Sequence, residues 1–81
     1  MSVLSKRGRQ YRDSIQNIEV AEAERSDVLG LLTQLERKKK DRRIRTAAYR
    51  KLNQDYQKRL RRVNNTIDRT LIELRSLLTE Q

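Results

Sequence analysis

The chain has 81 residues, of which 20 are Lys or Arg and 11 are Asp or Glu, so its formal net charge is +9. This length allows one small domain at most, and a hydrophobic share of 35% with an aromatic share of 4% excludes a thick globular core. The chain contains neither His nor Cys, which removes the commonest general base, the strongest nucleophile and every thiolate ligand. We therefore expect a protein that is not an enzyme and that has no cofactor and no metal site.

The composition is typical of helices. Pro is absent, and the two glycines, Gly8 and Gly30, are isolated. No apolar run approaches the roughly 20 residues that span a bilayer, and no signal-peptide pattern follows the first basic residues. The default expectation is a soluble, cytoplasmic all-α protein.

The first ten residues are predicted to form a mobile basic arm, followed by a helix over about 11–40. Asp13 and Gln16 resemble a capping pair for that helix. The segment 13–36 carries six acids against Arg25 alone, so it is acidic. Its heptads place Tyr11, Ile18, Arg25 and Leu32 at position a, and Ala21, Val28 and Leu35 at position d.

The apolar spacing lapses near residue 41 and resumes at residue 49, which predicts a turn over about 41–45 and a second helix over about 46–80. Thr46 is the candidate cap of the second helix. Its heptads place Asn53, Leu60, Ile67 and Leu74 at a, and Tyr49, Tyr56, Val63, Thr70 and Leu77 at d. Leu71 and Leu78 widen this stripe, which suggests contact with more than one neighbouring helix.

Two architectures fit these heptads. The first is an antiparallel two-helix coiled-coil hairpin, and the second is one long helix of about 70 residues in a coiled coil, since both segments share one register. The hairpin is favoured, and because it leaves half of each helix in water we expect it to form a homo-oligomer or to bind a helical protein partner. The predicted helix-packing residues are Ile18, Val28, Leu32, Leu35, Tyr49, Leu52, Tyr56, Leu60, Val63, Ile67, Leu71, Leu74 and Leu77.

Thirteen Lys or Arg residues against two acids occupy residues 37–62. Such a block attracts polyanions: nucleic acid, an anionic membrane or an acidic protein. A solvated charge run is the alternative interpretation. The candidate polyanion-binding residues are Arg37, Lys38, Lys39, Lys40, Arg42, Arg43, Arg45, Arg50, Lys51, Lys58, Arg59, Arg61 and Arg62.

Residues 32–60 carry a recurrent helical pattern: Leu32-Thr-Gln-Leu35-Glu36, a basic stretch, Ile44, Thr46, Tyr49, Leu52, Tyr56 and Leu60. Over about residues 28–63 the chain resembles a helical-hairpin motif of archaeal-type assembly proteins, similar to the small hairpin subunit of the ESCRT-I headpiece. Members of that family usually have Gly two residues before the Ile, where this chain has Arg42. The resemblance implies a scaffold in a membrane-remodelling or cell-division complex.

Two functions are therefore predicted. The first is a non-catalytic assembly protein that joins partner helices through its apolar residues and docks an anionic partner or membrane with a basic tip. The alternative is a small basic nucleic-acid-binding protein that contacts phosphates without sequence preference. No small-molecule substrate is expected.

Overall fold

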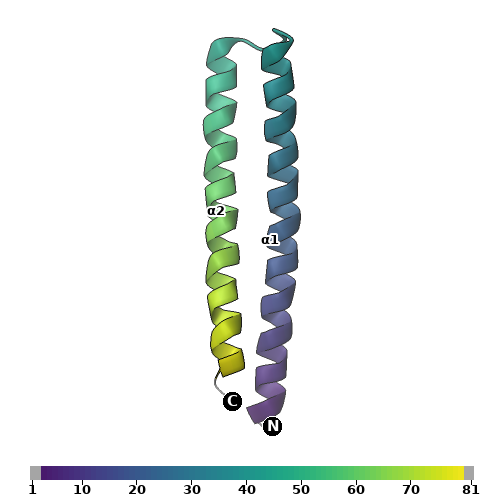
Figure 1. The fold of residues 1–81 in the computed structure, drawn as a ribbon, viewed down its shortest axis with the longest axis vertical. Helices are drawn as coiled ribbons and strands as arrows, with labels where there is room; N and C mark the ends of the chain where they lie inside the picture. The colour runs from purple at the N-terminus through teal and green to yellow at the C-terminus, as the bar shows by residue number, and fades with distance from the viewer. Residues whose placement is uncertain (1–2, 80–81) are drawn as a thin grey trace.

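The computed structural model describes the backbone of residues 3–79 and the side chains of residues 6–79. Helix α1 (Val3–Lys40) and helix α2 (Thr46–Thr79) lie antiparallel and side by side along their whole length (Figure 1). Their Cα atoms extend over 60 × 16 × 14 Å. The predicted hairpin is therefore confirmed, and the single long helix is excluded.

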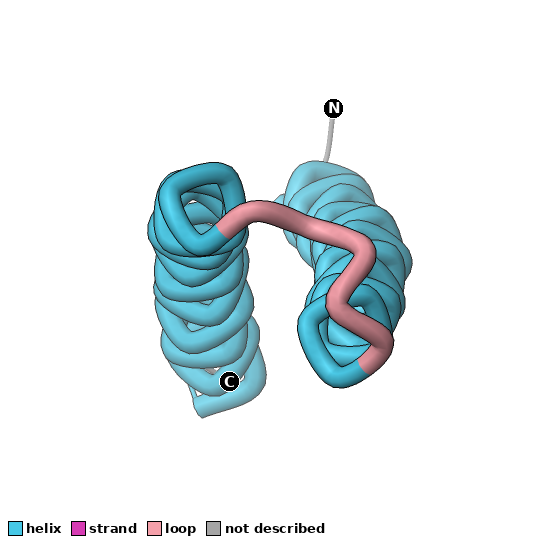
Figure 2. The backbone as a smooth tube through the Cα atoms, turned by 90° about the horizontal axis from the view of Figure 1, so that it is seen from above, coloured by secondary structure: helices cyan, strands magenta, loops and turns pink. Residues whose placement is uncertain are grey.

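The turn falls within the predicted residues 41–45, and backbone hydrogen bonds close α1 at Lys40. The Arg43 N–H donates to the Lys38 carbonyl over 2.8 Å, and the Arg42 N–H donates to the Lys39 carbonyl over 3.1 Å. This pair of bonds is a Schellman motif, which requires a left-handed residue just after the helix. Arg42 occupies that position with φ 57°, where glycine is the usual residue. The chain then crosses to α2 (Figure 2).

Two helix starts differ from the predictions. The Tyr49 N–H donates to the Arg45 carbonyl over 2.9 Å, so Arg45 is the N-cap residue and Thr46 is the first helical residue. Helix α1 already includes Val3, so Asp13 and Gln16 lie inside the helix and do not cap it. Residues 3–10 are therefore helical where an irregular arm was predicted, because a segment without Pro can extend a helix already formed beyond it. Residues 1–2 of the predicted arm lie outside the described residues.

Position d of the heptads forms the centre of the contact between the helices. Val28 is fully buried, with 0% of its surface exposed, and the other buried d residues are Ala21, Leu35, Val63 and Thr70. Ser14 continues the same spacing and is buried too, although it was not among the predicted core positions. The Thr70 hydroxyl donates to the Thr66 carbonyl over 2.7 Å, which satisfies a polar group in this narrow core.

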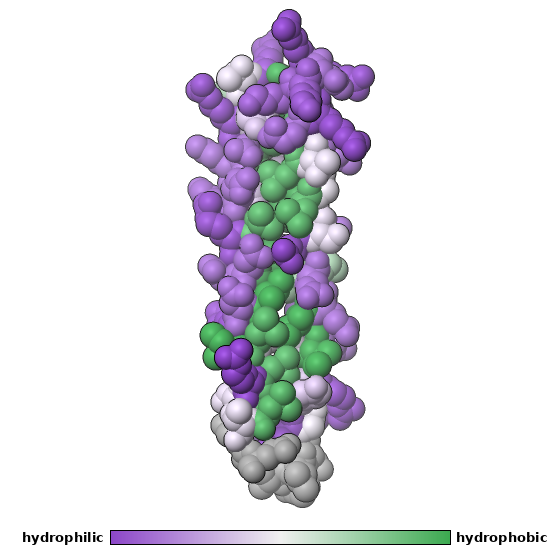
Figure 3. Space-filling view, viewed as in Figure 1, coloured by the Kyte–Doolittle hydropathy of each residue, from purple (hydrophilic) through white to green (hydrophobic). Residues whose placement is uncertain are grey.

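The two long sides of the hairpin differ in character. When d faces the partner helix, successive 100° steps place positions a and e on one side and positions c and g on the other. Grooves between the helices on the c and g side are lined by polar residues of both helices, including Asn17 and Glu24 from α1 and Thr66 and Glu73 from α2. Positions a and e of both helices must then share the opposite side. We call that opposite side the apolar face (Figure 3).

Candidate interaction surfaces

The basic block divides into two groups on the folded chain. The group at the turn, here called the basic tip, comprises Arg37, Lys38, Lys39, Lys40, Arg42, Arg43, Arg45, Arg50 and Lys51. The second group, Lys58, Arg59, Arg61 and Arg62, lies along α2 at heptad positions b, c, f and g, away from the apolar face. All thirteen predicted polyanion-binding residues are exposed. The structure therefore leaves every one of them accessible, and gathers nine of them at one end of the molecule.

Part of this charge also serves the fold. The residues Arg37–Lys40 form the last turn of α1, where cations offset the negative end of the helix dipole. Arg43 Nε lies 4.0 Å from Asp41 Oδ2, but both side chains are well exposed to water. An exposed ion pair of this kind adds at most about 1 kcal/mol. The turn thus depends on its backbone hydrogen bonds more than on charge pairing.

Tyr49 joins the two helices just below the turn. Its hydroxyl donates a hydrogen bond to Glu36 Oε1, and Lys39 Nζ lies 4.4 Å from the centroid of its ring. Sequence reasoning placed Tyr49 in the core and missed both contacts. The contacts could have been expected from the antiparallel pairing of the helices, which brings the last turns of α1 beside the first turns of α2. The hydrogen bond to the Glu36 carboxylate raises the pKa of Tyr49, with desolvation and the carboxylate charge adding to the effect.

We expect this contact to be visible in an alkaline titration. A group whose folded pKa is raised stabilises the fold at lower pH, and that contribution is lost as the pH rises through the folded pKa. In a variant with Tyr11→Phe and Tyr56→Phe, absorbance at 295 nm should report a midpoint for Tyr49 above the ordinary value of about 10. Adding Glu36→Ala should lower the midpoint towards that value. Glu19→Ala removes the same charge from an exposed residue elsewhere on α1, off the apolar face, and should leave the midpoint unchanged. Equal shifts in both variants would contradict the assignment.

The apolar face carries most of the predicted helix-packing residues that are incompletely buried. Ile18 and Leu32 from α1 and Leu60, Ile67 and Leu74 from α2 are half-buried. At the edges, 41% of Leu29, 48% of Leu71 and 57% of Leu78 is exposed. Figure 3 shows hydrophobic residues along the line between the two helices, with hydrophilic residues crowding the tip. The hairpin alone therefore leaves a long apolar surface in water.

Among the remaining predicted packing residues, Val28, Leu35 and Val63 are buried, and Tyr49, Leu52, Tyr56 and Leu77 are half-buried. Leu71 is the exception, since it is exposed. Position e places Leu71 at the edge of the apolar face, so one partner helix is not enough to cover it.

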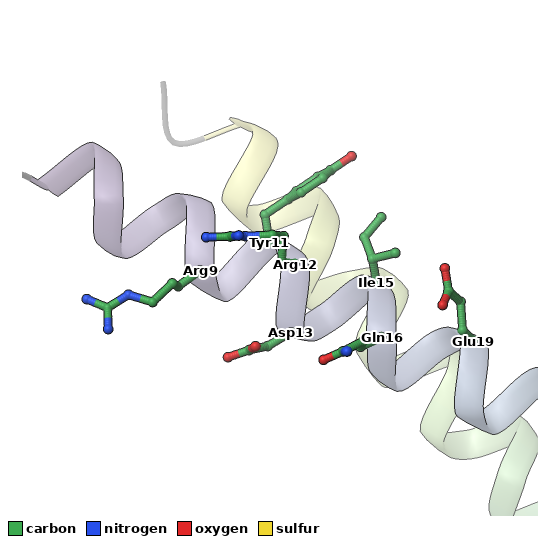
Figure 4. Close-up of a pocket in the computed structure, with 7 residues that line it drawn as sticks. All are labelled: Arg9, Tyr11, Arg12, Asp13, Ile15, Gln16 and Glu19. Carbon is green, nitrogen blue, oxygen red and sulfur yellow. The ribbon is translucent and has the colours of Figure 1, made fainter.

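At the end away from the turn, the apolar face continues onto a shallow groove of α1. Tyr11 and Ile15 extend from the same side of the helix, whereas Asp13 and Gln16 extend from the opposite side (Figure 4). Tyr11 is 40% exposed. The groove is lined by residues of α1 alone and offers no enclosed cavity for a small ligand.

Two charged residues interrupt the apolar face near the middle of α1, and Glu36 and Lys39 lie on the same side near the turn. Glu22 at position e and Arg25 at position a both lie near the middle of α1, and both are exposed. Asn53, the polar a residue of α2, is half-buried. The apolar face thus has a charged centre on α1 with leucine and isoleucine on either side.

Comparison with known proteins does not identify a function for these surfaces. No family model, no curated protein and no solved structure matches the chain. Within residues 3–79, neither helix contains a stretch apolar enough to cross a membrane.

Proposed function

We propose that this chain is a non-catalytic assembly protein that joins helices through its apolar face. The observation that carries the proposal is that the apolar residues at positions a and e of both helices lie on one side of the hairpin, where Leu29, Leu71 and Leu78 are exposed. Apolar side chains gathered on one side in this way are typical of protein interaction sites. The narrow core also supports the proposal. Within the described part of the chain its buried residues come from position d alone, so association would add stability by burying the half-buried leucines and isoleucines.

The basic tip is proposed as a second, separate docking surface for an anionic partner or membrane. Apart from Lys39 at position a and Arg50 at position e, its side chains lie off the apolar face, so the two surfaces can be occupied at the same time. A scaffold that binds helices along its length and an anionic surface at its end would suit a membrane-remodelling or cell-division complex, as the resemblance to the ESCRT-I hairpin implies.

The alternative function is nucleic-acid binding without sequence preference. It is favoured by the thirteen exposed basic side chains, which could contact phosphates at the tip and along α2. The three tyrosines do not strengthen it, since Tyr49 and Tyr56 are half-buried in the helix contact and Tyr11 borders the apolar face.

One paired experiment separates the two functions. Leu71→Asp places a charge at the edge of the apolar face, and Ile72→Asp places the same charge on the next residue, which is 67% exposed and points away from that face. If the chain is an assembly protein, Leu71→Asp should weaken self-association in analytical ultracentrifugation at least about tenfold, whereas Ile72→Asp should not. The half-buried Ile67→Asp should have a larger effect in the same direction.

The second half of the experiment reverses charges at the basic tip. Lys40→Glu combined with Lys51→Glu changes one exposed residue on each helix and leaves the apolar face intact. An assembly protein should keep its association in this variant. A nucleic-acid binder should instead hold labelled duplex with submicromolar affinity at 200 mM salt and lose that affinity on charge reversal. Association that is insensitive to Leu71→Asp would overturn the assembly proposal.

A further inference from the structure

Resting on the proposed function, we infer that the apolar face is covered by a second copy of this chain, with the two turns at opposite ends. The observation behind this inference is a pattern on α1. Its residues at positions a and e between Ile15 and Leu32 are arranged symmetrically about a point between Ala23 and Glu24. Residues at equal distances from that point are Ile18 and Leu29, and Ile15 and Leu32.

A two-fold axis through that level places each residue beside its counterpart on the other copy. In an antiparallel pair of α1 helices, Ile18 of one copy would lie beside Leu29 of the other, and Ile15 beside Leu32. Every one of these contacts joins a position a to a position e, and each occurs twice, as an isologous interface requires. The two-fold axis would cross α1 between Ala23 and Glu24, two residues from the midpoint of Val3–Lys40. The two copies would therefore overlap along nearly their whole length.

The same axis explains the charged centre of the face. Glu22 and Arg25 are also equidistant from the point between Ala23 and Glu24, so Glu22 of each copy would face Arg25 of the other. Two charges that interrupt an apolar surface in the single hairpin become two opposite-charge pairs in the dimer. Complementary charges of this kind fix register and orientation.

The other two-fold arrangement, with both turns at the same end, lacks these matches. It would stack α1 of one copy on α2 of the other, leaving Glu22 and Arg25 beside the uncharged a and e residues Leu60, Asn64 and Ile67. It would also bring two basic tips together. The arrangement with opposite turns places each tip instead beside the less basic N-terminal turns of the other copy.

The side of the hairpin is large enough to hold a stable dimer interface. Its Cα atoms outline about 60 × 16 Å, which is comparable with the roughly 800 Å² that each partner buries in standard interfaces. Each copy carries +9, so salt should screen their repulsion and tighten the dimer. This is opposite to the salt dependence of polyanion binding at the tip.

Because the chain has no cysteine, disulfide cross-linking can test the register directly. Ile18→Cys with Leu29→Cys should give a covalent dimer under mild oxidation. Within one chain these residues are about 16 Å apart along the helix, too far for a disulfide. Val20→Cys with Asp27→Cys is the matched control, since these exposed residues are equidistant from the same point but lie at position c, on the polar side. The control should cross-link at least about tenfold more slowly.

A charge swap tests the centre of the interface. Glu22→Arg and Arg25→Glu should each raise the dimer dissociation constant about tenfold, because each puts two like-charge pairs at the two-fold axis. The double variant Glu22→Arg/Arg25→Glu should return to within about threefold of the unmodified chain. No rescue in the double variant, or equal cross-linking of both cysteine pairs, would overturn the inference.

The two proposals fail in different ways. If ultracentrifugation shows an assembly that Leu71→Asp disrupts, but the Ile18 and Leu29 cysteines do not cross-link, the apolar face is an interface and this dimer is wrong. If the chain stays monomeric at every concentration reached, the dimer is wrong while a different helix can still occupy the face. If association persists in Leu71→Asp, the proposed function fails and the dimer with it.

Discussion

Val28→Asp is expected to abolish most of the helical structure of this protein. Val28 is fully buried, with 0% of its surface exposed, and it lies at a d position near the middle of the contact between α1 and α2. A carboxylate there would have no partner and no water, and removing an unpaired charge from water costs several kcal/mol. A hairpin with so narrow a core does not have that much free energy of unfolding to lose.

The measurement is far-UV circular dichroism at a concentration at which the unmodified chain is helical. Val20→Asp is the control, because it is the same substitution on the same helix at a side chain that is 68% exposed. We expect Val20→Asp to keep its helix signal and its thermal midpoint within a few degrees. Equal loss in both variants would mean that charge on α1, and not burial at position d, determines the effect.

The position of the core could be predicted because seven-residue spacing is a property of the sequence alone. Ala21, Val28, Leu35, Val63 and Thr70 were all assigned to d and are all buried. The same spacing extends back to Ser14, which is buried as well. Ser14 was not predicted as a core residue because serine is polar, although its small side chain allows two helices to approach closely.

The details near the turn could not be predicted in the same way. The left-handed conformation of Arg42, with φ 57°, does not follow from the residue itself, because glycine is the residue that usually adopts it. The hydrogen bonds of Arg42 and Arg43 to the last turn of α1, together with the contact between the helices, outweigh the local preference of one residue. The contact between Tyr49 and Glu36 likewise depends on the exact antiparallel register, which heptad assignment leaves open by one turn.

The sequence predicted which residues are charged or apolar, but not how they are arranged on the surface of the hairpin. The sequence indicated which basic residues form a block, and the structure adds that they split between the tip and the outer side of α2. The separation of an apolar side from a polar side follows from rotating both helices so that d faces the partner. The seven-residue spacing indicates that positions a and d both approach the other helix, but it does not say which of them is central, because both carry leucine, tyrosine and other apolar residues.

Arg42→Gly is expected to stabilise the hairpin. A side chain in the left-handed region costs roughly 1–2 kcal/mol, which glycine avoids. Glycine also gains more conformational freedom in the unfolded chain, and this offsets part of the benefit. The free energy of unfolding should therefore rise by about 1 kcal/mol, with a thermal midpoint several degrees higher in this small domain.

Arg43→Gly is the matched control for that measurement. It removes the same charge from the next residue, and Arg42 is the single non-glycine residue with positive φ that the structure describes. Arg43→Gly should therefore lower stability slightly, because it adds unfolded-chain entropy without relieving strain. Urea unfolding of the three proteins at equal concentration separates backbone strain from charge repulsion at the tip. If both glycine variants are stabilised equally, relief of charge repulsion is the cause. If only Arg42→Gly is stabilised, the cause is backbone strain at the left-handed residue of the turn.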